Sequence, residues 1–144
     1  MSTEANKALV RRLLDEGFNA GNMAVFDELL APDFVNHDPS MPEAGDREGL
    51  KQWWTALRTS FPDLHTDAEA LIAEGDMIVK RATGRGTMMG EFGGHAATGK
   101  RFVNPTISIY RIEDGQIKEL WWGYDNLSVV MQLGLIPHPE PASV

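Results

Sequence analysis

The N-terminal part of the chain carries apolar side chains at helical spacing. A first stripe predicts a long amphipathic helix that begins after Ser2 or Thr3. Its apolar face holds Leu9, Val10, Leu13, Leu14 and Phe18. A second, shorter helix is expected between Asn22, a potential N-cap, and Pro32, which ends it. A third helix is expected after the N-cap Asp46, and its apolar stripe consists of Leu50, Trp53, Trp54 and Leu57.

The rest of the chain changes to the pattern of strands. The connection at 34–39 between the second and third helices is short and ends in polar residues. Strands are expected over 64–73, 77–89, 102–112 and 117–124, with breaks at 74–76, 90–99 and 114–115. Because helices come first and antiparallel strands later, the order predicts an α+β fold in which N-terminal helices cover one face of a curved sheet.

The strand at 102–112 has two different faces. Val103, Ile107 and Ile109 alternate with a mixed set that consists of Asn104, Thr106, Ser108 and Tyr110. The mixed face could line a pocket with a polar bottom or meet another subunit, and the sequence leaves both open. Pro105 lacks a ladder donor, so a bulge or a sheet edge is expected there, and bulges bend sheets around cavities.

Size and composition indicate one domain. The chain has 144 residues and 42% hydrophobic content, enough for one substantial core over 1–144. Residues 136–144 are rich in proline and are expected to form an extended tail. Neither a signal peptide nor a membrane span is expected, and the chain has no cysteine, so we expect a cytoplasmic protein.

Several classes of partner are disfavoured by the charges and motifs. The formal charge of -8 and the scattered Lys and Arg residues argue against binding to nucleic acid. The four histidines do not share ligand spacing, so no metal site is expected. No phosphate loop or dinucleotide motif is present, and no serine elbow or lysine in an apolar surround suggests nucleophilic catalysis.

One carboxylate follows the aromatic end of the last strand. Asp125 comes directly after Trp121, Trp122 and Tyr124. Burial against such rings would raise the pKa of an Asp toward neutrality, which suits a general acid or base. The alternative is that Asp125 is the N-cap of a short helix over the following residues.

A second candidate group is Asn36-His37-Asp38. Its imidazole lies between an amide and a carboxylate, which could orient a base or bind a carbonyl oxygen. The alternative is a turn before Pro39, because Asn and Asp favour local hydrogen bonds there.

Aromatic and sulfur-containing side chains could enclose an apolar ligand. Trp53 and Trp54 are adjacent and cannot both point inward from one helix, so one is expected to meet a cavity, a loop or a partner. Met88 and Met89 precede a glycine-rich stretch at 90–95 that contains Phe92, and these side chains suit a lid over such a ligand. The alternative is a mobile hairpin connection.

Several motifs occur in order along nearly the whole chain. They are Asn19-x-Gly21, Leu30-Ala31-Pro32-Asp33-Phe34-Val35-Asn36-His37-Asp38-Pro39, Phe61-Pro62-Asp63-Leu64-His65, Ala73-Glu74-Gly75-Asp76, Gly86-Thr87, Thr98-Gly99-Lys100, Arg111-x-x-Asp114-Gly115-x-Ile117, Trp121, Asp125 and Gln132-Leu133-Gly134. Jointly they resemble the SnoaL-like polyketide cyclases, also called ester cyclases. The resemblance implies a cone-shaped fold of the nuclear-transport-factor-2-like (NTF2-like) superfamily, in which N-terminal helices and a strongly curved, mostly antiparallel sheet enclose an apolar pocket.

The resemblance also implies an activity. It is an intramolecular aldol condensation that closes a ring of an aromatic polyketide methyl ester without metal or cofactor, and its acid/base carboxylate maps to Asp125. Family members often carry histidine where this chain has Met88 and Leu120. The family forms homodimers through the outer face of the sheet, for which Tyr110, Ile112 and Trp122 could supply apolar surface.

Three hypotheses follow. The first is a cofactor-free enzyme acting on a small or polycyclic apolar carbonyl compound, in which Asp125 abstracts a proton from a cavity floor and Asn36, His37 or Tyr124 hydrogen-bonds the enolate. The expected ligand contacts are Trp53, Trp54, Phe61, Met88, Phe92, Asn104, Trp121 and Tyr124. The second is a non-catalytic binding protein for an apolar ligand, favoured by Met88 and Leu120. The third is a hydrolase or hydratase in which Asp125 activates water.

Overall fold

Helices open the chain in the computed structural model, which describes residues 2–137. They are α1 (Thr3–Arg12), a π-helical continuation (Leu13–Asn19) and α2 (Met23–Leu29). The predicted N-caps are confirmed, because the side chain of Ser2 accepts from the N–H of Ala5 and that of Asn22 from the N–H of Ala24. The long first helix is also confirmed, although its second half is wound more widely than an α-helix.

The sheet has five strands in the order β1-β5-β4-β3-β2. Their bounds are β1 (Leu30–Asn36), β2 (His65–Glu74), β3 (Met77–Thr87), β4 (Arg101–Glu113) and β5 (Gln116–Tyr124). β1 runs parallel to β5, and all other neighbours are antiparallel. The four predicted strands are confirmed to within two residues at each end. β1 is an addition, and its Pro32 is tolerated because β1 is an edge strand.

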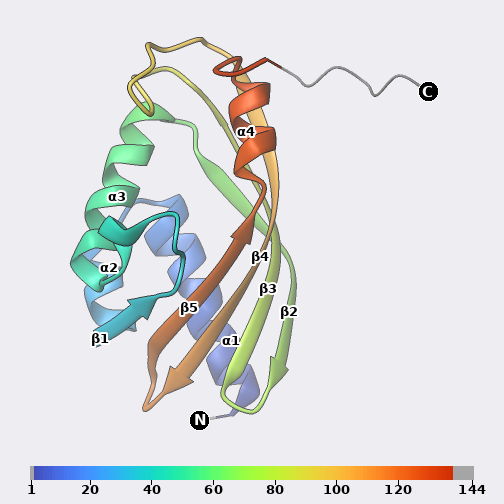
Figure 1. Ribbon diagram of the computed structural model, residues 1–144. Coiled ribbons are helices and arrows are strands. Elements are labelled where there is room, and N and C mark those ends of the chain that lie inside the picture. Colours follow the sequence, from blue (N-terminus) through green and yellow to red (C-terminus); the bar gives the residue numbers. More distant parts are fainter. Residues whose placement is uncertain (1, 138–144) are drawn as a thin grey trace.

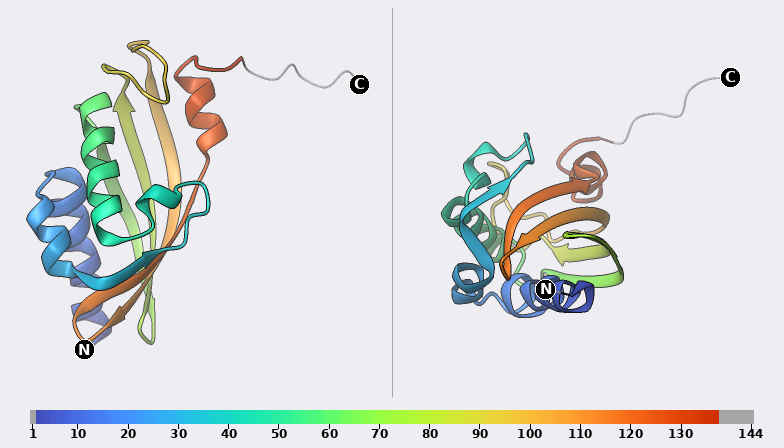
Figure 2. Two further views of the ribbon diagram at one scale, coloured as in Figure 1. Left: turned by 60° about the vertical axis from the view of Figure 1, so that its left-hand side comes forward. Right: turned by 90° about the horizontal axis from the view of Figure 1, so that it is seen from below.

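Two further helices complete the fold. α3 (Arg47–Ser60) follows a short 3-10 turn at Pro42–Ala44, and the side chain of its N-cap Asp46 accepts from the N–H of Gly49 at 2.7 Å. α4 (Asn126–Gln132) comes directly after β5. Figures 1 and 2 show the curved sheet wrapped around α1, α2 and α3, with α4 at the end of the sheet that is farther from the N-terminus. This arrangement confirms the predicted α+β fold.

The core lies between the concave face of the sheet and the helices. Its largest fully buried side chains include Phe26, Phe34, Phe61, Leu50 and Leu120. Gly17 permits close contact within the helical layer, because a Cβ there would lie 3.1 Å from the ring of Phe26. Between residues 2 and 137, no helix has the length and apolar character that a membrane crossing requires.

The two faces of β4 differ in burial, which shows which of them lines the interior. The mixed face points inward, and Ser108 and Tyr110 are almost fully buried. The apolar face points outward, where Val103 and Ile107 are 54% and 56% exposed. The expectation that Tyr110 and Ile112 form an outer dimer surface is therefore wrong, because both side chains belong to the core. The predicted tail lies, from residue 138 onward, outside the described residues.

Candidate functional site

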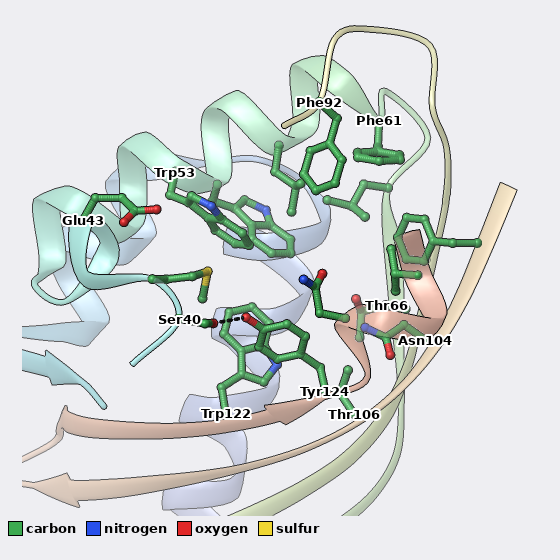
Figure 3. Close-up of a pocket in the computed structure, with 18 residues that line it drawn as sticks. Ser40, Glu43, Trp53, Phe61, Thr66, Phe92, Asn104, Thr106, Trp122 and Tyr124 are labelled. Atoms are coloured by element: carbon green, nitrogen blue, oxygen red, sulfur yellow. Dashed lines mark hydrogen bonds between the residues drawn. The ribbon is translucent and has the colours of Figure 1, made fainter. Parts of the chain in front are cut away.

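A cavity of about 260 Å³ lies between α3 and the concave face of the sheet. Figure 3 shows Trp53, Phe61 and Phe92 on its helix side and Asn104, Thr106 and Tyr124 on its sheet side. The complete lining is Ser40, Met41, Glu43, Trp53, Trp54, Leu57, Phe61, Leu64, Thr66, Gly84, Phe92, Phe102, Asn104, Thr106, Trp122, Tyr124, Asn126 and Val129.

The helix side of the cavity is aromatic. Trp54 is almost fully buried and its Nε1–H donates to the carbonyl oxygen of Phe18 at 2.9 Å, whereas Trp53 is only partly buried. The expectation that one of the two meets a cavity is met by both, because Trp53 and Trp54 each line it, although they differ in burial. The ring of Trp122 from β5 lies 6.2 Å from Trp53 and 6.1 Å from Trp54, centroid to centroid. These rings offer flat apolar surface to a ligand.

The sheet side combines aromatic rings from Phe102, Trp122 and Tyr124 with small or hydrogen-bonding residues on β2, β3 and β4. Thr66, Gly84 and Asn104 pair across the three strands in one row. Two residues further along β4, Thr106 pairs with Tyr124 of β5. The Oδ1 of Asn104 accepts from the backbone N–H of residue 125 at 3.3 Å. That bond leaves the NH₂ group of Asn104 available to a ligand oxygen.

A chain of hydrogen bonds leads out of the cavity from Tyr124. Its hydroxyl lies 2.7 Å from the Oγ of Ser40, which in turn donates to Oδ1 of Asp38 at 2.6 Å. Burial raises the pKa of Tyr124 above its usual value, and its bond to Ser40 opposes that shift. The phenol is therefore neutral near pH 7. The carboxylate of Asp38 is buried.

Asp125 does not lie in the cavity. It is exposed, and its carboxylate accepts from the backbone N–H of Ser128 at 2.9 Å, as the N-cap of α4. The expectation of a buried Asp125 on the cavity floor is therefore wrong. The reason is strand parity: Trp122 and Tyr124 point inward from β5, and the chain leaves the strand after Tyr124. The N-cap alternative describes its position.

The second candidate group is divided between two places. Asn36 is buried and holds the following loop, since its NH₂ donates to the carbonyl of Ala44 and its Oδ1 accepts from the N–H of Asp38. His37 lies on the outer side, where its ring stacks on Trp121 at 4.8 Å and its Nε2 is 3.0 Å from Glu119. None of Asn36, His37 and Trp121 lines the cavity.

The glycine-rich segment contributes one side chain to the cavity. Phe92 lines it and packs edge-on against Phe61 at 5.3 Å. Met88 is fully buried in the core, where the hydroxyl of Thr98 donates to its sulfur at 3.6 Å. The expectation that Met88 lines the ligand cavity is therefore wrong, because its side chain is fully buried in the core.

One lysine departs from the sequence-based expectation. Lys80 is 5% exposed, and its Nζ lies 5.5 Å from the ring centre of Phe18 and 5.3 Å from that of Tyr110. It therefore does lie in an apolar surround, where cation–π contacts stabilise it. The alternation along β3 places it inward, and this pattern could have been recognised from the sequence. It does not line the cavity.

Six of the residues that were expected to contact a ligand line the cavity: Trp53, Trp54, Phe61, Phe92, Asn104 and Tyr124. Sequence reasoning missed Trp122 as a lining residue, although its parity with Tyr124 is a usable signal. Nothing in the sequence marks Ser40, because a loop brings it to the end of β5. Among residues 2–137, no three His, Asp or Glu side chains gather closely enough to hold a metal ion.

Nearly the whole chain matches a known protein family. A family model described as SnoaL-like polyketide cyclase matches residues 8–133. This chain belongs to the SnoaL-like polyketide cyclase family. The family predicted from the motifs is therefore confirmed.

Relatives of this SnoaL-like chain include two named cyclases. The chain is 31% identical to the aklanonic acid methyl ester cyclase DnrD of Streptomyces peucetius, covering 98% of this chain and 97% of DnrD. It is 30% identical to the aklanonic acid methyl ester cyclase DauD of Streptomyces sp. (strain C5), covering 92% and 83%. The solved structure of TsrD from Streptomyces laurentii matches with a TM-score of 0.84 at 28% identity, covering 94% and 99%. The predicted NTF2-like cone is thus confirmed.

Proposed function

We propose that this chain is a polyketide cyclase that closes a ring in an apolar, polycyclic carbonyl compound by intramolecular aldol condensation, without metal or cofactor. The observation that supports the proposal most strongly is a cavity whose lining combines several aromatic rings with hydrogen-bonding side chains. Family membership and the cyclase names of DnrD and DauD support the same reaction class.

This lining suits a flat ligand that carries oxygen atoms along one edge. The rings of Trp53 and Trp122 would cover the apolar face of such a ligand. The NH₂ group of Asn104 and the hydroxyls of Thr66 and Thr106 would meet carbonyl oxygens on the sheet side. A donor aimed at a carbonyl oxygen also stabilises the enolate that forms when a neighbouring proton is removed.

The first experiment uses aklanonic acid methyl ester, the compound in the names of two relatives. The protein is incubated with the ester, and the products are separated by liquid chromatography with mass detection. We expect a product of unchanged mass and altered retention, because an aldol ring closure is an isomerisation. Quenching of tryptophan fluorescence measures binding, since Trp53, Trp54 and Trp122 line the cavity.

Matched variants link both signals to the cavity. Trp53→Ala is expected to weaken binding of the ester by removing aromatic surface from the wall. Ile72→Ala is the control, because Ile72 is 61% exposed on β2 and does not line the cavity. Equal losses in both variants would refute the cavity as the binding site.

A binding protein for an apolar ligand is the second candidate. It is favoured by the positions of Met88 and Leu120, which replace family histidines with side chains that are fully buried in the core. Saturable fluorescence quenching by the ester without any product, under conditions where DnrD turns it over, would support this candidate and refute the enzyme.

We also propose that the protein is a cytoplasmic homodimer. The absence of cysteine supports the location. Val103 and Ile107 support the assembly, because both are exposed on the outer face of β4, where a second copy could cover them. Light scattering is expected to give twice the chain mass of 15.9 kDa, and Ile107→Lys to give the single-chain mass. A wild-type protein of single-chain mass would refute the dimer.

A further inference from the structure

Asp38 carries a buried carboxylate that is bonded to Ser40 at the edge of the cavity. Asp38 is 8% exposed, and its Oδ1 accepts from both the backbone N–H and the hydroxyl of Ser40, at 2.9 and 2.6 Å. Its Oδ2 is buried, and no described residue donates a hydrogen bond to it. Buried polar atoms are nearly always paired, so an unpaired carboxylate oxygen calls for a specific explanation.

The direction of the hydrogen bonds is fixed by this carboxylate. The Oδ1 of Asp38 accepts the hydrogen bond, so the O–H of Ser40 donates to it. The Oγ of Ser40 can then only accept in its contact with Tyr124, so the phenol O–H donates to Ser40. The lone pairs of the Tyr124 oxygen remain for a group inside the cavity, which Tyr124 lines (Figure 3).

We propose that Tyr124 is the catalytic acid/base group of this cavity, and that Ser40 and Asp38 are positioning residues that receive and return its proton. The inference rests on the proposed cyclase function and names the group that moves the proton. Tyr124 takes the role first expected of Asp125. Asp125 is exposed and is the N-cap of α4, whereas Tyr124 lines the cavity.

The reaction balances along this chain. The C–H bond next to a substrate carbonyl breaks, its electron pair forms the enolate, and its proton goes to the oxygen of Tyr124. The phenol proton moves to Ser40 and the proton of Ser40 moves to Asp38, which becomes a neutral acid. The enolate carbon then attacks the second carbonyl of the same molecule, a C–C bond forms, and the resulting alkoxide takes the proton back along the same path. No other reactant is consumed.

The electrostatic surroundings agree with a shared proton. Burial raises the pKa of Tyr124, and the negative charges of Asp38 and Glu43 add to that shift. A free tyrosinate is therefore disfavoured, and concerted transfer to Ser40 avoids forming one. Asp38 and Glu43 are the carboxylates that act on this phenol among the described residues.

The decisive experiment compares hydroxyl removals in the two tyrosines of the chain. Tyr124→Phe is expected to lower kcat for aklanonic acid methyl ester roughly 10²-fold or more, with KM little changed. Tyr110→Phe is the matched control, because Tyr110 is buried in the core away from the cavity, and we expect wild-type kcat. A Tyr124→Phe protein that retains wild-type kcat would overturn the proposal.

Ser40 provides a conservative test of the relay. Ser40→Ala removes the bridging hydroxyl and is expected to lower kcat, whereas Ser40→Thr keeps a hydroxyl and is expected to restore most of it. A merely structural role would give parallel losses of kcat and melting temperature in both variants. Ser40→Ala with wild-type kcat would overturn the relay.

A titration separates failure of the relay from failure of the cyclase function. In a Tyr110→Phe background, Tyr124 is the single tyrosine, and its ionisation is followed by ultraviolet absorbance. Adding Asp38→Asn is expected to lower the pKa of Tyr124, because a negative charge is removed. If the wild type gives no product, the cyclase function is refuted, and this titration alone decides the coupling. An unchanged titration would overturn it.

Discussion

Gly84 offers a substitution that should stabilise the protein and weaken ligand binding at the same time. It lies within β3 and lines the cavity. A Cβ added there would lie 3.4 Å from Oγ1 of Thr66 and 3.8 Å from the carbonyl oxygen of Asn104, which are ordinary contacts. Gly84→Ala therefore fits without displacing a neighbour, and its methyl group occupies space that a ligand needs.

The expected gain follows from backbone freedom. Glycine within a strand costs about 0.5–1 kcal/mol relative to alanine, so Gly84→Ala should raise the free energy of unfolding by about that amount. For a chain of this size, about 1 kcal/mol corresponds to a rise in melting temperature of roughly 2–4 °C. Binding of aklanonic acid methyl ester, measured by tryptophan quenching, should weaken because the cavity holds only about 260 Å³.

Gly86 is the matched control, two residues further along the same strand. A Cβ there would lie 3.1 Å from the ring of Phe102 and 3.3 Å from the Cβ of Phe61. Overpacking of this kind costs about 1–3 kcal/mol, so Gly86→Ala should lower the melting temperature. If thermal unfolding shows equal destabilisation in both variants, the open space next to Gly84 does not exist and the reasoning is refuted.

Three further predictions concern the same region. Asp125→Ala should lower the free energy of unfolding by about 0.5–2 kcal/mol through loss of the N-cap, while Asp125→Asn should stay near wild type, as urea denaturation will show. Trp54→Phe should cost about 1–3 kcal/mol, because it removes the bond to the carbonyl of Phe18 and leaves a space, and Trp53→Phe should cost less on the same urea curves. Above about pH 10.0, the ordinary value for tyrosine, stability should fall in the wild type, because the unfolded chain releases the Tyr124 proton before the folded one does. Tyr124→Phe should reduce that fall, and melting temperatures across alkaline pH will show whether it does.

Much of the fold could be predicted because it depends on local patterns. The caps Ser2, Asn22 and Asp46 were identified from residue type and from the apolar stripe that follows each one. The strands β2 to β5 were identified from alternation and from their turns. β1 was not, because Pro32 and Asp33 are poor strand formers and its partner β5 is distant in sequence. Only the folded sheet brings these two segments together.

The site was harder to predict because it depends on which way each residue of a strand points. The sequence motif draws attention to Asp125, yet the inward positions of β5 are Trp122 and Tyr124, and the chain turns into α4 directly after them. Ser40 reaches the cavity, with Asp38 bonded to its hydroxyl, from a loop whose path is set by the hydrogen bonds of Asn36 to the turn at Ala44 and to the N–H of Asp38.

This geometry gives Asn36-His37-Asp38 a different meaning from the one suggested by its residue types. Asn36 shapes the loop and His37 stacks on the outer Trp121. Asp38 does not line the cavity and is linked to it through the hydroxyl of Ser40. A carboxylate placed behind a serine and a tyrosine can exchange a proton with a ligand without contacting it. The acid/base function is thereby separated from the binding wall, so substitutions in the relay and in the wall should affect kcat and KM separately.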